Sequence, residues 1–171
     1  MKIKQEHILI FALLLIGSIS RLVPHAPNFT AVTAMALFAG AYLKPQYALW
    51  LPALVLFVTD LFLGFHSTMV FVYGAMMIVG LFSYWGLSQK VEGVKVLGSS
   101  LVGSLIFFVI TNLGVFLVDG MYSKNLTGFV ECYVMALPFL KNQLAGDLFF
   151  SGLFFGAYKL YLSRRFIFRT N

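Results

Sequence analysis

Polar and ionisable side chains gather in one short stretch of this chain, from Arg21 to Thr30. The stretch places an arginine, a histidine, two prolines and an asparagine between two segments that are almost wholly apolar. A guanidinium group can bind a carboxylate or phosphate through two parallel hydrogen bonds, and imidazole and amide groups can both donate and accept. This pattern predicts a polar hinge that forms part of a solute-binding face.

Four further polar residues lie within or beside later apolar segments, and we expect them to line or support the same site. Asp147 is the deepest of them, well inside its segment. An ionisable side chain at such a depth costs about 2.5–3.5 kcal/mol, so it is expected to face a cavity or a partner. The complete predicted substrate-binding set is Arg21, His25, Asn28, Asp60, His66, Asn112 and Asp147.

Some of these residues also have a purely structural interpretation. Asp147 could pair with Arg21 or hydrogen-bond Asn112 inside the helical bundle, and Arg21 could extend into the lipid headgroup layer. A carrier predicts a closed, water-lined pocket that bears Asp147 and Asn112. An assembly subunit predicts that these two residues pair with each other in a packed interior.

Metal-dependent and enzymatic functions are less favoured by the pattern. His25, His66 and Cys132 could together hold a transition metal, but their spacing matches no zinc motif, so no metal and no cofactor are expected. The chain has no nucleophile elbow, no phosphate-binding glycine loop and no paired carboxylates at a recognisable spacing. A membrane enzyme that uses His25, Asp60 or Asp147 is therefore the least favoured alternative.

The elements that position these residues are apolar enough to cross a membrane. Of the 171 residues, 60% are hydrophobic and 11% are charged, far from the composition of a soluble domain. The net charge of +6 comes from basic residues at the ends of apolar segments and not from one patch, so no nucleic-acid partner is expected. The composition predicts an all-α integral membrane protein whose direct partner is the lipid bilayer.

Six apolar segments predict a single domain, residues 1–171, built as a six-transmembrane-helix bundle. The expected spans are residues 8–20, 31–43, 48–65, 69–87, 96–118 and 138–162. The second would be only ~20 Å long against ~30 Å of hydrocarbon, so it is tilted among its neighbours, extended by irregular backbone or partly re-entrant. Asn28 or Thr30 is expected to cap it.

Residues 122–137 are expected to lie along the outer interface. A cleavable signal peptide is the alternative interpretation of the first segment.

Basic residues set the expected orientation. Nine of the twelve lysines and arginines fall on one side of a six-span path, which predicts both termini in the cytoplasm and a multi-pass protein of the bacterial inner membrane. The hinge then lies outside, where the second, fourth and sixth helices begin and present positive dipole ends. Small residues at 98–104 and at Gly152 and Gly156 are expected to form internal helix-packing faces.

Several segments carry a resemblance to known families. They are Arg21–Ala31, Ala36–Leu43, Asp60–His66, Thr111–Gly114 and Glu131–Phe139. Over most of its length the chain resembles a family of small, uncharacterised bacterial six-span membrane proteins with this hinge motif.

More loosely, the chain looks like the substrate-binding S component of energy-coupling factor (ECF) vitamin transporters. The shared features are six short helices, a polar first loop, a second span rich in small residues and an aspartate at the end of the third. This resemblance implies an outward-opening pocket for a vitamin-like micronutrient, with a separate energising ATPase and coupling subunit. The segment His7–Gly17 lacks the Ala-x-x-x-Ala surface by which such components dock, so a solitary carrier stays open.

These observations predict a non-enzymatic membrane carrier or substrate-binding component that captures a small polar or anionic solute at the outer face. The alternative is a structural or assembly subunit of the bacterial envelope. The sequence names neither the solute nor the energy source.

Overall fold

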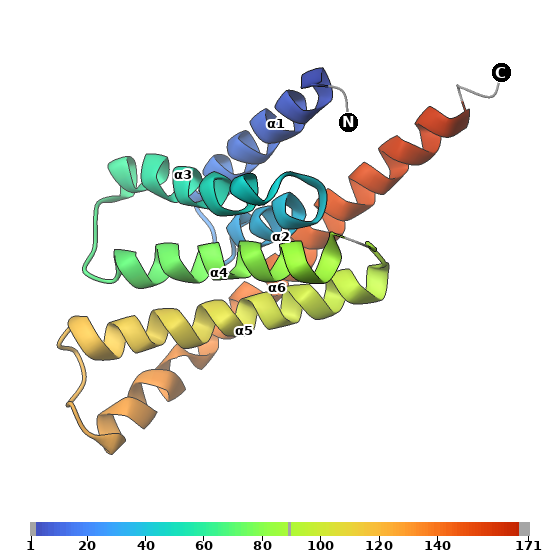
Figure 1. Cartoon of the computed structure of the whole chain (residues 1–171). Coiled ribbons are helices and arrows are strands. Elements are labelled where there is room, and N and C mark those ends of the chain that lie inside the picture. Colours follow the sequence, from blue (N-terminus) through green and yellow to red (C-terminus); the bar gives the residue numbers. More distant parts are fainter. Residues whose placement is uncertain (1–2, 89, 168–171) are drawn as a thin grey trace.

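The structure is a computed structural model that describes residues 3–88 and 90–167, and this part of the chain forms six α-helices (Figure 1). In chain order they are α1 (Ile3–Leu22), α2 (Val32–Tyr42), α3 (Pro45–Leu63), α4 (Met69–Leu87), α5 (Gly93–Val118) and α6 (Leu126–Ile167). Each predicted span corresponds to one helix, and α4 has the predicted bounds. Among the described helices, α3, α4 and α5 are long and apolar enough to cross a membrane, which indicates a membrane protein.

The short helix α2 lies at the centre of the bundle. It has 11 residues, and the ten from Val32 to Ala41 are buried. It contacts all five other helices, most extensively α4, α3 and α6. At about 16 Å it is roughly half as long as the ~30 Å hydrocarbon core of a membrane is thick. Because the other helices enclose α2, its short length does not leave it exposed to lipid, whereas residues 22–28 before it are exposed on the surface of the bundle.

Close backbone contacts hold α2 and α3 against α4. A Cβ atom added at Gly40 would lie 2.6 Å from the carbonyl oxygen of Gly80, and one added at Gly80 would overlap the carbonyl of Ala48. On α5, Ser100, Gly103 and Ser104 are buried, as expected for a packing face. Small residues let these helices approach closely where larger side chains would separate them.

The prediction that Gly152 and Gly156 form an internal packing face was wrong. Both are exposed, and a Cβ atom added at either would meet no atom of the described structure within 4 Å; the same holds for Gly98. The bundle instead packs the opposite side of α6, where Ser151, Phe154 and Phe155 are buried. The pair on α6 therefore lies on the outer surface of the bundle.

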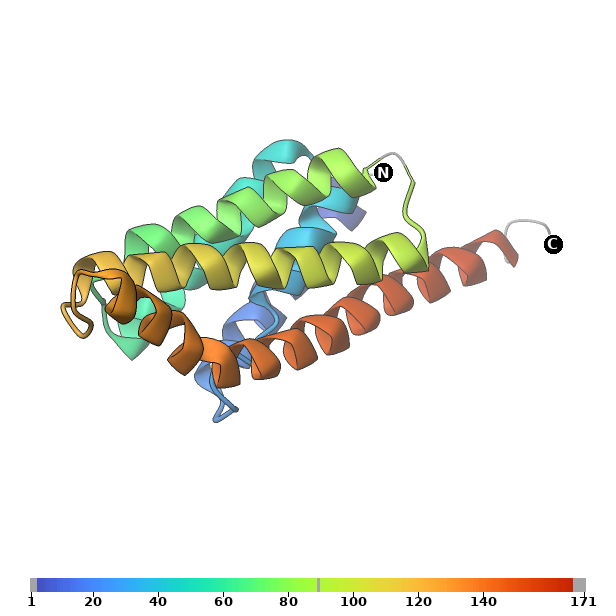
Figure 2. The same ribbon diagram turned by 90° about the horizontal axis from the view of Figure 1, so that it is seen from below.

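The last helix is longer than predicted. The segment 122–137 was expected to be separate from the sixth span, but residues from Leu126 onward belong to the 42-residue helix α6. The Asn125 side chain caps its start by accepting a hydrogen bond from the backbone N–H of Gly128 (2.9 Å). Pro138 lies inside the helix and bends it without ending it, and Figure 2 shows the change of direction in the orange part of α6.

The two ends of the bundle are formed by different segments of the chain. The described start of α1 and the described end of α6 lie at the same end, as both views show (Figures 1 and 2). The hinge between α1 and α2 lies toward the other end, where α3 and α5 finish and α4 and α6 begin. An even number of traverses gives this arrangement, and it brings the predicted polar residues into one half of the molecule.

Candidate functional site

The hinge is an ordered loop that packs back onto the bundle. Asn28 adopts a φ of 64°, a left-handed conformation that asparagine tolerates better than most residues. The hydroxyl of Ser20 accepts a hydrogen bond from the backbone N–H of Ala31 (3.0 Å), which ties the end of α1 to the start of α2. The Phe29 ring packs against Phe149 and Phe150 of α6, at 6.1 and 5.8 Å between ring centroids.

The prediction that Asn28 or Thr30 caps α2 was wrong. The residue at the cap position is Ala31, and no side chain of the described structure caps the helix. Asn28 makes the left-handed turn instead, and it lies too far before the first helical turn to reach its N–H groups. Ser20 instead binds the backbone N–H of Ala31, the residue at the cap position.

Arg21 reaches inward from the end of α1 and forms a buried ion pair with Asp60 of α3. Its Nη2 lies 2.8 Å from Asp60 Oδ1, and its Nη1 donates to Thr59 Oγ1 at 2.8 Å. The Tyr73 hydroxyl of α4 donates to the second carboxylate oxygen at 2.9 Å. The Arg21 side chain is 15% exposed and that of Asp60 is 1% exposed. This cluster joins three helices through charge-assisted hydrogen bonds.

Two structural alternatives for Arg21 and Asp147 are thereby excluded. Arg21 pairs with Asp60 and not with Asp147, and it points into the bundle and not toward a headgroup layer. Asp60 lies one turn from the end of α3, which brings its carboxylate level with the end of α1. Asp147 lies on α6, where Ser104 of α5 donates a hydrogen bond to its carboxyl group.

A pocket of about 310 Å³ opens beside this cluster. Its walls come from α1, the hinge, α2, α3, α4, α5, α6 and the loop between α3 and α4. The lining residues are Arg21, His25, Asn28, Thr30, Val32, Thr33, Leu56, Leu63, His66, Val72, Met76, Phe107 and Gln143. Four of the seven predicted site residues therefore line one cavity, and a fifth, Asp60, lies directly behind one of the four.

The pocket changes from an exposed rim to a buried floor. His25, Asn28 and His66 are exposed, whereas Thr33 and Gln143 are each 2% exposed. His25 Nδ1 lies 2.7 Å from the carbonyl oxygen of Ala26, so this nitrogen carries the proton and Nε2 can accept when the ring is neutral. His66 Nδ1 lies 2.9 Å from Thr68 Oγ1. Polar groups at both ends of a partly apolar cavity can orient a small solute.

Asp147 lies behind the floor of the pocket and is not among its lining residues. It is 1% exposed and accepts a hydrogen bond from Ser104 of α5 at 2.7 Å. The side chains of Thr33 and Gln143 also face its carboxyl group and interact with it. The Gln143 amide nitrogen donates to the carbonyl oxygen of Ser104 at 3.4 Å. This buried network joins α2, α5 and α6.

Asn112 lies outside the pocket. Its side-chain amide donates to the backbone carbonyl oxygen of Phe108 in the same helix at 2.7 Å. The backbone carbonyl oxygen of Asn112 lies 3.5 Å from the Cys132 sulfur. It therefore supports the contact between α5 and the first part of α6. Asp147 and Asn112 do not contact each other, and neither lines the pocket. The structure therefore has neither the water-lined pocket bearing both residues that a carrier predicts nor the pairing of the two that an assembly subunit predicts.

The three residues considered for metal binding are not gathered. His25 and His66 lie at the pocket rim, and Cys132 is buried between α5 and α6. Across residues 3–88 and 90–167, no group of three His, Cys, Asp or Glu side chains is arranged to hold a metal ion. Of the three helix starts expected to present positive dipole ends, α2 borders the pocket through Val32 and Thr33.

Sequence reasoning missed several polar residues of the site. Thr33, Gln143, Ser104 and Tyr73 all contribute, and each is a polar side chain within an apolar helix. Gln143 precedes Asp147 by four residues, a spacing that places both on one face of a helix. That spacing was a usable signal.

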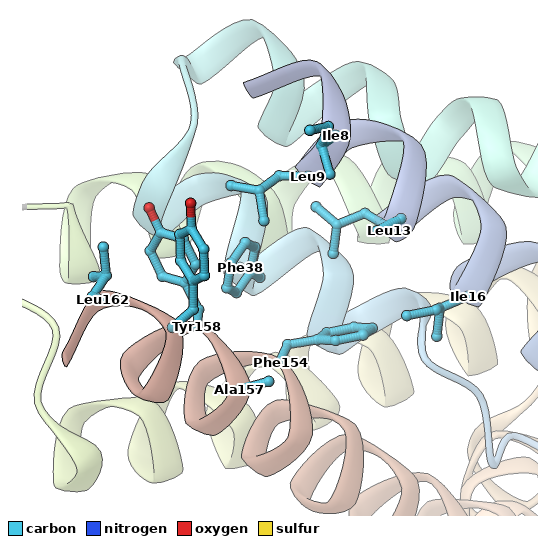
Figure 3. A pocket seen from close by; sticks show the side chains of 11 residues that line it. Ile8, Leu9, Leu13, Ile16, Phe38, Phe154, Ala157, Tyr158 and Leu162 are labelled. Atoms are coloured by element: carbon cyan, nitrogen blue, oxygen red, sulfur yellow. The ribbon is translucent and has the colours of Figure 1, made fainter. Parts of the chain in front are cut away.

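A larger cavity of about 570 Å³ lies at the other end of the bundle. Figure 3 shows Leu9 and Leu13 of α1 facing Phe154 and Tyr158 of α6 across it, with Phe38 of α2 between them. Its lining is apolar apart from tyrosine hydroxyls. It offers no charged group or amide to orient a polar solute, so the smaller pocket is the candidate site.

Comparison with known proteins gives the family. The family model described as "Family of unknown function (DUF6580)" matches residues 1–169, and the chain belongs to this family. No curated protein and no solved structure matches the chain.

Proposed function

We propose that this DUF6580 protein is a membrane carrier or substrate-binding component that captures a small polar solute in the pocket beside the hinge. The observation that carries the proposal is the convergence of Arg21, His25, Asn28 and His66 on one cavity. These residues come from three different parts of the chain. Exposed polar side chains converging on a half-buried cavity are typical of small-molecule sites.

The proposed topology has six spans with both termini in the cytoplasm of a bacterial cell, and the pocket facing outward. The common end of α1 and α6 supports an even number of spans. The basic residues at that end support its cytoplasmic location. If the sequence resemblance to an S component holds, energy comes from a separate ATPase through a coupling subunit; the alternative is a solitary carrier.

The Arg21 and Asp60 pair favours a polar solute over a strongly anionic one. The guanidinium charge is already compensated by a carboxylate at 2.8 Å, so an incoming anion gains less from it than from a free arginine. The sequence left polar and anionic solutes open. The proposal therefore puts uncharged polar molecules first.

A structural or assembly subunit of the envelope is the second candidate. Its supporting observation is the exposed pair Gly152 and Gly156 on the outer surface of α6, where an added Cβ would meet no atom of the described structure within 4 Å. A helix of another membrane protein can approach closely at such a surface. A coupling subunit could use the same surface, so this feature alone does not separate the two functions.

Native mass spectrometry of the protein purified from its own membrane tests the carrier function. We expect a bound small molecule that is retained by the wild-type protein and lost from the His25→Ala and Asn28→Ala variants. His7→Ala is the matched control, because His7 is exposed on α1 outside the pocket lining. Retention by both pocket variants, or absence of any ligand from wild-type protein, would count against the carrier.

A further inference from the structure

One polar atom on the floor of the pocket has no partner. Gln143 is 2% exposed, and its side-chain carbonyl oxygen, Oε1, accepts no hydrogen bond from the described residues. Its side chain lines the pocket. Buried amide oxygens are nearly always paired, so an unpaired one at the floor of a cavity marks a position where a donor is missing.

The orientation of this amide is fixed by its surroundings. The amide nitrogen lies 3.4 Å from the carbonyl oxygen of Ser104, which can only accept a hydrogen bond. Exchanging the amide oxygen and nitrogen would bring two oxygens together and leave the nitrogen without this acceptor. Oε1 is therefore the unpaired atom of a side chain that lines the pocket floor.

The charges around the floor select against an anion. Asp147, which is 1% exposed, faces the Gln143 side chain from behind. The nearest cationic group of the pocket, Arg21, is paired with Asp60. A carboxylate or phosphate at the floor would meet an amide oxygen and a buried carboxyl group with no free cation to offset them.

From this arrangement we infer that the solute of this pocket is an uncharged polar molecule that places an N–H or O–H donor on Gln143 Oε1. Amides, ureides and lactam-type heterocycles belong to this class. The inference rests on the proposed function and narrows its substrate from a polar or anionic solute to a neutral hydrogen-bond donor.

Three benzoyl compounds, of which benzoate matches benzamide in size, test the inference on the full chain in lipid nanodiscs. Benzamide is neutral and has N–H donors, N,N-dimethylbenzamide is neutral without them, and benzoate is an anion without them. Ligand-observed NMR measures the binding of each probe at millimolar concentration. We expect benzamide to bind roughly tenfold or more tightly than the other two, because an amide oxygen left unpaired on binding costs about that factor.

Two variants assign the effect to the pocket floor. Gln143→Met keeps the length of the side chain but removes the acceptor, and it should reduce the advantage of benzamide to about twofold or less. Gln46→Leu is the matched control, because Gln46 is exposed at the start of α3 and outside the pocket lining, and it should leave the advantage unchanged. If the Met variant does not fold, the comparison of the three probes on wild-type protein still decides.

The outcomes separate the inference from the proposed function. If benzoate or N,N-dimethylbenzamide binds as tightly as benzamide and His25→Ala weakens all three, the pocket binds solutes but the donor requirement is wrong. An unchanged preference in Gln143→Met also overturns the inference. If no probe binds wild-type protein, the pocket is not a solute site and both proposals fail.

Discussion

Replacing Asp60 by asparagine tests whether the ion pair with Arg21 holds the hinge half of the bundle together. The substitution keeps the shape of the side chain but removes its charge. The carboxylate now accepts from Arg21 at 2.8 Å and from the Tyr73 hydroxyl at 2.9 Å, and it is 1% exposed. A neutral amide in its place would leave the guanidinium group without a counter-charge inside the protein.

The expected loss follows from the burial of the two partners. Removing one partner of a buried ion pair costs about 3–5 kcal/mol. Arg21 is 15% exposed, so water can partly solvate the orphaned cation, and the lower end of the range applies. Asp60→Asn should therefore lower the free energy of unfolding by about 3 kcal/mol. Tyr73→Phe, which removes one neutral donor, should cost about 1 kcal/mol.

A double-mutant cycle separates the pair from its surroundings. Arg21→Met should cost more than Asp60→Asn, toward the upper end of that range, because it leaves the 1%-exposed Asp60 carboxylate without a cation. The double variant should cost about 3 kcal/mol and not the sum of the two, because neither charge is then left unpaired. Unfolding by titration in mixed detergents measures the free energy of unfolding of the wild-type protein, the two single variants and the double variant. Glu131→Gln, at an exposed carboxylate on α6, is the control and should change stability by less than about 0.5 kcal/mol.

Two results would contradict a stabilising role for the ion pair. A loss below about 1 kcal/mol for Asp60→Asn would mean that the pair does not stabilise the bundle. Single losses that add up in the double variant would mean that Arg21 and Asp60 act independently. Either result would mean that Asp60 does not compensate the Arg21 charge, and Arg21 could then bind an anionic solute in the pocket.

Three other predictions follow from packing and topology. Gly80→Ala should lower the thermal midpoint of unfolding by several degrees, because its Cβ would overlap the Ala48 carbonyl, whereas Gly152→Ala meets open space and should leave the midpoint unchanged. Cys132 is 1% exposed and should resist maleimide labelling until the protein unfolds, whereas a Ser67→Cys thiol in an exposed loop should label at once in the Cys132→Ala background. A C-terminal reporter fusion should be active in the cytoplasm, and an exported reporter would contradict the six-span topology.

The sequence was informative about position along the helices. Long apolar runs placed the six helices to within a few residues for most boundaries, and the hinge was recognisable because polar residues are costly between such runs. It also predicted that Arg21, His25, Asn28 and His66 belong together, since all lie near the same end of their segments. The depth of a residue along its helix follows from its position in the sequence, because each helical residue adds about 1.5 Å.

The sequence was uninformative about which side of each helix faces its neighbours. Lipid is as apolar as the protein interior, so a membrane helix shows no clear polar stripe to orient it. This is why Gly152 and Gly156 were assigned to the interior although they are exposed, and why Asp147 was paired with the wrong residues. Gln143 escaped notice for the same reason, because its importance depends on facing the pocket.

The enclosure of α2 has a consequence for how the protein is made. This helix is second in the order of synthesis, but the surfaces that cover it come mostly from helices made later, α3 to α6. Phe38 of α2 packs against Phe154 and Phe155, more than a hundred residues further along the chain. Thr33 and Gln143, which form the pocket floor, come from the same two distant helices. A nascent chain therefore lacks the complete pocket until α6 has been translated and has packed against α2.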